Sequence, residues 1–380
     1  MKIETLCLHA DQNLKDEWGS ITEPVYLSAT FVHSSTSIST YSYSRLSNPT
    51  RKHLENTVAA IEYGSEAFAF SSGMAALSTV MKLFSVGSHI IASNDLYGGS
   101  LRLFRNVNAQ LEGLSFDFVD TFNTDNIEKL INANTKAIYL ETPSNPLLLV
   151  TDIAEVASIA KKNNLLLIVD NTFLSPYLQN PLSHGADIVI HSGTKYLSGH
   201  NDVLAGFAVV KDPSIAEKIA YYSKTIGACL SPFDSFLVER GIKTLPIRMD
   251  RICENAKKIA YWLRDQPFVT KVNYIGFSDR KDYPITLRQS RGFGGMISFE
   301  LSSARLARKL LESVRLFQYA ESLGGVDSLV TYPMAQTHAD LPEKERELRG
   351  INDRFLRISV GLENVEDLIE DLRQAIENEI

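Results

Sequence analysis

Cysteine and long apolar runs are both scarce in this sequence. The three cysteines, Cys7, Cys229 and Cys253, are widely spaced, and none belongs to a Cys-x-x-Cys pair. Neither a disulfide framework nor a zinc knuckle is therefore expected, and we interpret the cysteines as ordinary thiols. The strongly apolar stretches, such as residues 165–169 and 203–210, are far shorter than the roughly 20 residues a membrane helix needs. We expect no membrane span.

Basic residues are outnumbered by acidic ones. The chain has 38 Lys and Arg against 45 Asp and Glu, a net charge of −7, which argues against a nucleic-acid footprint and a polybasic membrane anchor. Residues 1–5 are followed by polar residues instead of an apolar signal segment, so we expect a cytoplasmic protein. The eight histidines show no metal-ligand spacing, so no metal is expected.

Three common functional fingerprints are missing too. The sequence contains no Gly-x-Gly-x-x-Gly and no Gly-x-x-x-x-Gly-Lys-Ser/Thr, the motifs of dinucleotide and P-loop binding. It also lacks the Gly-x-Ser-x-Gly elbow of the α/β-hydrolases.

A chain of 380 residues is longer than one hydrophobic core usually organises, so we expect two domains. Short apolar runs alternate with turns and helical patterns between about residues 65 and 210, which predicts an α/β fold with a mostly parallel sheet covered by helices. The expected strands are 67–70, 89–92, 115–119, 137–140, 165–169, 188–191 and 206–210. The expected helices between them include 74–83 and 153–163.

The pattern changes after about residue 240. A helix over 252–265 precedes expected strands at 269–273, 296–301 and 355–359, with helices at 304–312 and 365–379, which predicts a smaller α+β domain. The first fifty residues are polar and turn-rich, and we expect an arm that packs on a second subunit. The predicted division is an arm over 1–50, a large domain over 51–240 and a small domain over 241–380.

Ligands of open α/β sheets bind outside the carboxyl ends of the strands, so the residues that follow each apolar run are candidates for the site. Ser72, Gly73 and Met74 open a helix after the first strand, where backbone N–H groups can hold a phosphate. Asp170 follows a fully apolar strand and needs a cation or a hydrogen-bond donor as its partner. Lys195 lies among small hydroxyl residues at another strand end, where a lowered pKa would make it a nucleophile.

Each of these features has an ordinary explanation: a plain turn, a helix-capping aspartate and a surface lysine. Together they form the three parts needed to hold pyridoxal phosphate. A lysine bonds to its aldehyde, a carboxylate keeps its pyridine nitrogen protonated, and a helix N-terminus takes its phosphate.

Eight motifs in order, spread over some three hundred residues, then resemble one family, the Cys/Met-metabolism pyridoxal phosphate enzymes. This group holds cystathionine γ-synthase, cystathionine γ-lyase and β-lyase, methionine γ-lyase and the homoserine sulfhydrylases. The motifs are Tyr-Ser-Arg at 43–45 before Asn-Pro-Thr at 48–50, Ser-Gly-Met at 72–74, Tyr-Gly-Gly at 97–99, Glu-Thr-Pro-Ser-Asn-Pro at 141–146, Asp-Asn-Thr at 170–172, Ser-Gly-Thr-Lys-Tyr at 192–196, Ser-Leu-Gly-Gly at 322–325 and Arg-Ile-Ser-Val-Gly at 357–361.

The resemblance implies fold type I of the pyridoxal phosphate enzymes, with a large domain whose mostly parallel sheet lies between helices and a smaller α+β C-terminal domain. It implies that Lys195 carries the cofactor and shuttles protons, Asp170 pairs with the pyridinium nitrogen, and Tyr97 stacks on the ring as a possible acid or base. The further cofactor contacts implied are Gly73, Met74, Thr172, Ser192, Thr194 and, from a neighbouring subunit, Tyr43 and Arg45. The substrate contacts implied are Asn145, Glu321, Ser322 and Arg357.

The resemblance also implies a homotetramer, built from two dimers whose active sites are shared, and a small sulfur amino acid as substrate. We favour β/γ-elimination by a cystathionine lyase, with cystathionine γ-synthase as the alternative. Methionine γ-lyases usually place Cys where Gly99 stands, and homoserine sulfhydrylases are longer, so both are less favoured. Two alternatives come from other functional classes: an aminotransferase, and a catalytically silent regulator with this fold.

Overall fold

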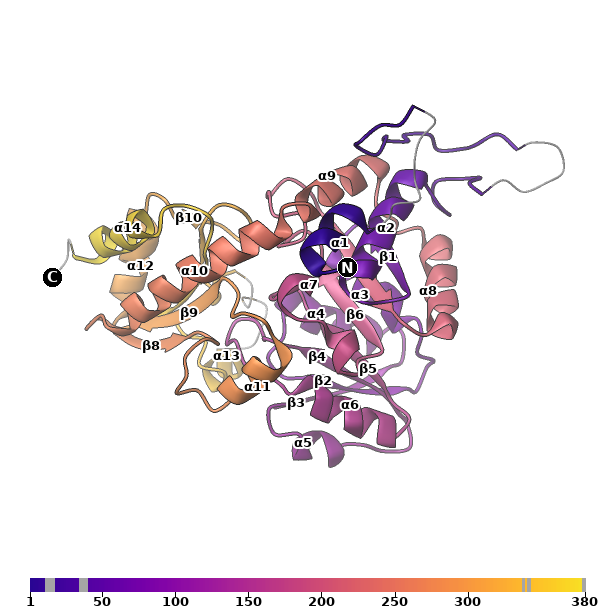
Figure 1. The fold of residues 1–380 in the computed structure, drawn as a ribbon. Helices are drawn as coiled ribbons and strands as arrows, with labels where there is room; N and C mark the ends of the chain where they lie inside the picture. The colour runs from indigo at the N-terminus through magenta and orange to yellow at the C-terminus, as the bar shows by residue number, and fades with distance from the viewer. Residues whose placement is uncertain (11–17, 34–39, 337–338, 340–342, 378–380) are drawn as a thin grey trace.

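The computed structural model describes residues 1–10, 18–33, 40–336, 339 and 343–377, and two sheets organise them (Figure 1). The larger sheet has seven strands in the order β1-β7-β6-β5-β4-β2-β3. The strands are β1 (Glu66–Phe70), β2 (His89–Ser93), β3 (Ser115–Val119), β4 (Thr135–Glu141), β5 (Leu166–Asp170), β6 (Ile188–Ser192) and β7 (Gly206–Val210). Strands β2 to β6 pair in parallel and β7 runs antiparallel to β1 and β6, so the predicted mostly parallel sheet is confirmed.

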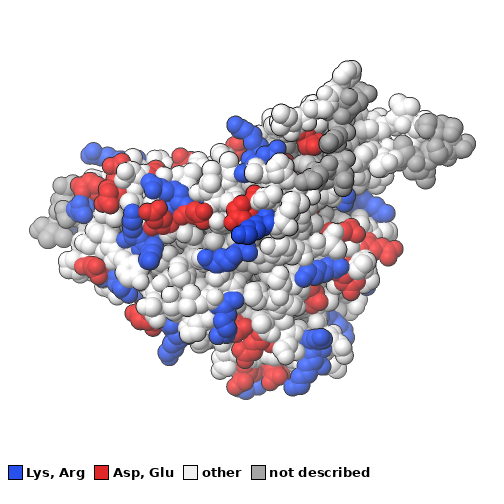
Figure 2. All heavy atoms as spheres, in the orientation of Figure 1, with Lys and Arg blue, Asp and Glu red and all other residues white. Residues whose placement is uncertain are grey.

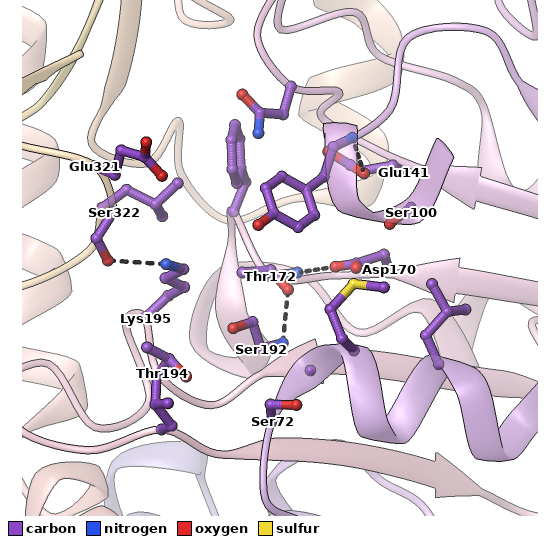
Figure 3. A pocket seen from close by; sticks show the side chains of 18 of the residues that line it. Ser72, Ser100, Glu141, Asp170, Thr172, Ser192, Thr194, Lys195, Glu321 and Ser322 are labelled. Carbon is purple, nitrogen blue, oxygen red and sulfur yellow. Dashed lines mark hydrogen bonds between the residues drawn. The ribbon is translucent and has the colours of Figure 1, made fainter. Parts of the chain in front are cut away.

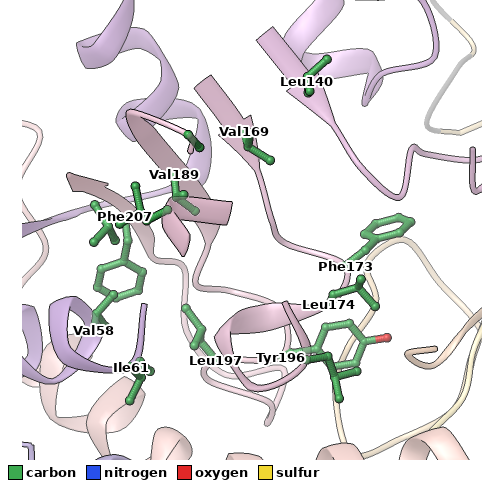
Figure 4. Packing of buried hydrophobic residues seen from close by; sticks show 14 of the residues in the cluster. Val58, Ile61, Leu140, Val169, Phe173, Leu174, Val189, Tyr196, Leu197 and Phe207 are labelled. Atoms are coloured by element: carbon green, nitrogen blue, oxygen red, sulfur yellow. The ribbon is translucent and has the colours of Figure 1, made fainter. Parts of the chain in front are cut away.

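Helices cover both faces of this sheet. On one face, α2 (Pro49–Ile61) and α6 (Ile153–Lys162) pack on side chains such as Val169 and Val189 (Figure 4). On the other, α3 (Gly73–Met81), α4 (Gly98–Arg102) and α8 (Pro213–Ile226) pack on side chains such as Ile168 and Ile190. Successive strand residues alternate between the two faces, as extended backbone requires.

A five-stranded sheet in the order β10-β11-β12-β9-β8 forms the core of the C-terminal part. Its strands are β8 (Val269–Asn273), β9 (Met296–Leu301), β10 (Gln318–Tyr319), β11 (Leu329–Thr331) and β12 (Phe355–Ser359). The helices here are α11 (Tyr283–Gln289), α12 (Ala304–Ser313), α13 (Glu343–Leu348) and α14 (Val365–Glu377). Residues 378–379 of the expected final helix lie outside the described residues.

Three helices separate the two sheets in the sequence. Helix α8 covers the large sheet, and it is followed by α9 (Pro232–Ile242) and the long α10 (Leu245–Arg264). Helix α10 contacts α7 (Ser175–Leu178) in the first part of the fold and β8, β9 and α14 in the second, and Figure 1 shows it running from one part to the other. The expected helix at 252–265 thus begins one to two turns earlier. The division at 240/241 stays a prediction, since α9 runs across it.

The N-terminal segment differs in part from the expected arm. Residues Ile3–His9 form helix α1, which packs on α2 and α10 with Ile3 and Cys7 buried. Ile3 and Cys7 are four positions apart and therefore lie on one face of the helix, which is the face that packs on α2 and α10. Residues 18–33 and 40–47, in contrast, project from the body of the molecule as expected of an arm (Figure 1). Residues 11–17 and 34–39 of the expected arm lie outside the described residues.

Charges of both signs are interspersed on the face of the molecule shown in Figure 2. Within the described ranges, no helix combines the length and the apolar character that crossing a membrane requires.

Two glycines let α3 begin directly against the sheet. A Cβ at Gly206 would lie 2.0 Å from the carbonyl oxygen of Ser72, and one at Gly73 would lie 3.0 Å from the Cα of Ser192. The first contact is with backbone, which cannot rotate away. The N-terminus of α3 therefore lies closer to β6 and β7 than side chains at these positions would permit.

We expect Gly206→Ala to lower the free energy of unfolding by about 1–3 kcal/mol, because overpacking a rigid site costs that much. The measurement is the urea midpoint of the variant. Gly292→Ala is the control, since a Cβ there meets only the terminal carbons of Leu178 at 3.0 Å or more and the side-chain sulfur of Cys253 at 3.6 Å. Equal midpoints for the two variants would contradict the close-approach explanation.

Candidate active site

A cavity of about 350 Å³ opens at the carboxyl ends of the parallel strands, where the chain also brings in residues of the C-terminal part. All the predicted site residues except Tyr43 and Arg45 line it. They come from the ends of β4, β5 and β6, the starts of α3 and α4, the loop before β11 and strand β12; Figure 3 shows several of them. The residues predicted from the strand ends therefore lie together around one cavity.

One end of the cavity is suited to an anion. Helix α3 begins at Gly73, and the Oγ of Ser72 caps it by accepting from the N–H of Ala75 at 3.1 Å. The N–H groups of Gly73 and Met74 then have no acceptor inside the helix. The hydroxyl-bearing side chains of Ser72, Ser192 and Thr194 gather at the same end (Figure 3). N–H groups, hydroxyls and the positive helix end favour a phosphate.

Two carboxylates lie side by side on neighbouring strands. Glu141 and Asp170 end β4 and β5 and are partners in the ladder. Glu141 Oε2 accepts from the backbone N–H of Tyr97 at 3.0 Å, and Asp170 Oδ1 accepts from the N–H of Thr172 at 2.9 Å. Burial and the charge of Asp170 raise the pKa of Glu141 well above its usual range. Burial also raises the pKa of Asp170. Such a pair attracts a cationic group strongly.

Lys195 lies across the cavity from these carboxylates. Its Nζ donates to the Oγ of Ser322 at 2.8 Å (Figure 3). Burial, reinforced by the positive charge of Arg357, lowers the pKa of Lys195 to about 8, while Glu321 acts in the opposite direction. Ser322 has a φ of +102°, an uncommon conformation for a residue with a Cβ. A lysine with this pKa is a good nucleophile and proton carrier near neutral pH.

Arg357 lies on β12 and is fully buried, yet its guanidinium faces the cavity. Nη1 donates to the Oδ1 of Asn145 at 2.7 Å, and Nη2 donates to the carbonyl of Ser322 and the hydroxyl of Thr331, both at 3.1 Å. Burial lowers its pKa to about 10. Within the described part of the chain Nε has no acceptor. These contacts fix the guanidinium in place and leave a donor for a ligand.

Tyr43 and Arg45 lie outside this cavity. Arg45 Nη1 donates to the carbonyl of Lys224, and the guanidinium lies 5.5 Å from the centre of the Tyr43 ring. Tyr43 is 45% exposed. Neither residue contributes to the site of its own chain.

Several residues that line the cavity received no role from the sequence; Glu141, named only as the first residue of a family motif, is the charged one among them. Its place directly after an apolar strand, like that of Asp170, is the signal that could have found it. Ser100, Phe173 and Leu204 also line the cavity, and no pattern in the sequence distinguishes them.

These residues fit pyridoxal phosphate. The anion-binding end suits its phosphate, the two carboxylates suit its ring nitrogen, and Lys195 suits its aldehyde. The free N–H on buried Arg357 suits the carboxylate of an amino acid.

Comparisons with known proteins agree with this geometry. The profile of a family described as Cys/Met metabolism PLP-dependent enzyme matches residues 4–377. The cystathionine β-lyase of Coxiella burnetii is 46% identical over 377 residues, which cover 98% of this chain and 97% of that protein. The cystathionine γ-synthase of Haemophilus influenzae is 46% identical over 377 residues, which cover 99% of this chain and 98% of that protein.

A solved structure of cystathionine γ-lyase from Lactobacillus plantarum, complexed with L-serine, superposes with a TM-score of 0.96 at 44% identity, covering 99% of each chain. The fold and site thus define a pyridoxal phosphate enzyme of fold type I. The chain belongs to the family of Cys/Met metabolism PLP-dependent enzymes.

We expect acylation of the Lys195 amine in cofactor-free protein to increase with pH and to level off above about 8. Only the neutral amine attacks, and the lowered pKa means that it is neutral above that pH. Lysine in a peptide, with a pKa of about 10.4, keeps gaining reactivity well beyond that point. Competitive labelling followed by mass spectrometry, with a lysine peptide in the same tube, measures both profiles. Coincident profiles would contradict the lowered pKa.

Proposed function

We propose that this enzyme uses pyridoxal phosphate to cleave the carbon–sulfur bond of cystathionine and related sulfur amino acids by β- or γ-elimination. The second candidate is cystathionine γ-synthase chemistry, in which cysteine replaces the leaving group of an activated homoserine. The observation that carries the proposal is the convergence of Lys195, Asp170 and Arg357 on one cavity. The relatives named as lyases and as a synthase support both candidates.

The chain's own residues divide the work. When bound, pyridoxal phosphate supplies an electron sink for the carbon atoms of the substrate. Asp170 would hold the proton on the ring nitrogen, and Gly73, Met74, Ser192 and Thr194 would hold the phosphate. Tyr97 would cover the ring, in a position for which Gly99 leaves space: a Cβ there would lie 2.4 Å from Tyr97 Cε1. Methionine γ-lyases usually have Cys at the position of Gly99, and a Cβ there would meet the Tyr97 ring as it lies here. This packing therefore supports the view that methionine γ-lyase is a less favoured function.

Lys195 is the proposed proton carrier. Its Nζ would remove the α-proton of the substrate and, for γ chemistry, also move a β-proton, because its lowered pKa lets it both take and release protons near neutrality. Ser322 Oγ orients this amine. The Tyr97 hydroxyl would serve as the second acid or base.

The substrate would be held at its two ends. Arg357, fixed by Asn145 and Ser322, would bind the α-carboxylate through a planar, charge-assisted contact. Glu321 lines the cavity near Lys195 and would attract a second ammonium group farther along the substrate. Cystathionine carries such a group.

A shared active site is the proposed reason for the projecting segment. Trp18, Ile21 and Val32 are each more than 80% exposed, a cost in water that burial in a second subunit would remove. We propose that Tyr43 and Arg45 reach the phosphate end of a neighbouring subunit's cavity, and that two such dimers form a homotetramer. The three cysteines are unpaired, which agrees with the proposed cytoplasmic location.

We expect the enzyme loaded with pyridoxal phosphate to convert L-cystathionine and water into a 2-oxo acid, ammonia and a thiol. Mass spectrometry identifies the bond: pyruvate with homocysteine marks β-cleavage, and 2-oxobutyrate with cysteine marks γ-cleavage. Lys195→Ala should lose at least about a hundredfold in rate, the lower range for one proton-transfer group. Formation of cystathionine from O-acetyl- or O-succinylhomoserine and cysteine, without cleavage, would replace the first proposal by the second.

A mixing experiment tests the shared site. Arg45→Ala should weaken retention of pyridoxal phosphate, and Lys195→Ala should be inactive. In a mixed dimer one site would pair an intact Lys195 with an intact Arg45 from the other subunit. We expect refolding the two variants together to restore part of the activity at limiting cofactor. No gain over the Arg45→Ala variant alone would contradict the proposed sharing of the site between subunits.

A further inference from the structure

A second polar cluster lies buried behind the cavity, and Glu62 is its centre. Glu62 ends α2 as its C-cap residue and is fully buried. Its Oε1 accepts from His191 Nε2 at 2.7 Å and from Asn171 Nδ2 at 2.9 Å, and its Oε2 accepts from Asn180 Nδ2 at 3.2 Å. All three partners are buried. A buried carboxylate with three donors is a well-satisfied charge.

The cluster follows from the alternation of side chains along the strands. Asp170 and Ser192 lie on the α3 face of the sheet, as do Ile168 and Ile190 two residues earlier. The residues next to them in sequence, Asn171 and His191, therefore point to the opposite face, toward α2. Each donor to Glu62 Oε1 is thus the immediate neighbour of a cavity residue.

Gln179 extends the cluster to the third strand end. Its Nε2 donates to the Oδ1 of Asn171 and to the carbonyl of Thr142, both at 2.9 Å. Thr142 directly follows Glu141. The ends of β4, β5 and β6 are therefore tied together from behind, and each tie is one residue away from a polar side chain of the cavity.

We propose that Glu62 is a positioning residue of the active site, which holds Asp170 and Ser192 in place for the cofactor through Asn171 and His191. The inference rests on the proposed use of pyridoxal phosphate. Glu62 touches no ligand; it acts through the two strand ends. Small displacements there matter, because groups that bind and orient a reacting molecule must be held closely.

Charge supports the same role. Burial raises the pKa of Asp170, whereas its hydrogen bonds with Thr172 and the positive charge of a protonated His191 lower it. The pKa of Asp170 thus depends in part on His191, the residue that Glu62 holds by a hydrogen bond.

The chain provides a matched control for a merely structural role. Glu239 on α9 is also buried, faces His53 Nε2 of α2 at 3.4 Å, and accepts from the hydroxyl of Thr57 at 3.3 Å. Like Glu62, it is paired with a buried histidine and lies outside the cavity, but its partners His53 and Thr57 are not sequence neighbours of any cavity residue. Its loss should affect stability without affecting the cofactor.

Glu62→Gln is the principal test. Its amide keeps one oxygen, but its NH₂ group would face the NH₂ of Asn180, whose Oδ1 is already engaged by Arg291 at 2.8 Å. We expect the dissociation constant for pyridoxal phosphate to rise about tenfold, the lower range for outer partners of metal ligands. We also expect the visible absorbance of the bound cofactor to shift. Glu239→Gln should change neither property.

The outcomes separate the possibilities. Unchanged affinity and absorbance in Glu62→Gln, or equal changes in Glu239→Gln, would overturn the proposal. If Glu62→Gln does not fold, Asn171→Ala removes one tie and keeps the Glu62–His191 pair; cofactor affinity like that of the wild type would then overturn it. Failure of the wild-type protein to bind pyridoxal phosphate would instead count against the proposed function.

Discussion

The loss of hydration at the carboxyl edge of the large sheet is the constraint on which the rest of the structure depends. Three parallel strands end there in polar residues that face a largely enclosed space, and a charge removed from water needs a partner. Glu141 accepts a hydrogen bond from the N–H of Tyr97, and Asp170 accepts one from the N–H of Thr172. Lys195 donates a hydrogen bond to Ser322. Each partner is itself a cavity residue, so satisfying the charges also assembles the site.

The period of two along the strands divides this edge into a reactive side and a supporting side. Asp170 and Asn171 are adjacent in sequence but serve opposite faces, one lining the cavity and the other bonded to Glu62. Because the same backbone carries both, a side chain on the α2 face can fix the direction of one on the α3 face. Helix α2 thus has two tasks: it covers the core and it braces the strand ends.

The sequence was enough to predict the strands of the large sheet and the polar residues that follow them, because both depend on local pattern. Arg357 illustrates what local pattern cannot supply. It lies on β12 of the other sheet and reaches the cavity through tertiary packing alone, so only the family resemblance pointed to it. Helix α1 escaped prediction for a related reason: seven residues are too few to be helical in isolation, and packing on α2 and α10 stabilises them. Glu141 was named only within a family motif and received no role, although its position at a strand end matches that of Asp170.

Like charges are grouped within the cavity in a way that disfavours the empty protein and favours its ligands. Burial is the main cause of the lowered pKa of Lys195 and of the raised pKa of Glu141, and the charges of Arg357 and Asp170 add to these shifts, so each pair disfavours its own charged forms. A ligand that brings a cationic ring to the carboxylates and an anionic carboxylate to the guanidinium relieves both repulsions. The repulsion within each pair thus becomes part of the free energy of binding, and ligand binding in turn stabilises the fold. The fold holds Asp170 and Glu141 in place because their sequence neighbours, Asn171 and Thr142, are themselves hydrogen-bonded behind the cavity.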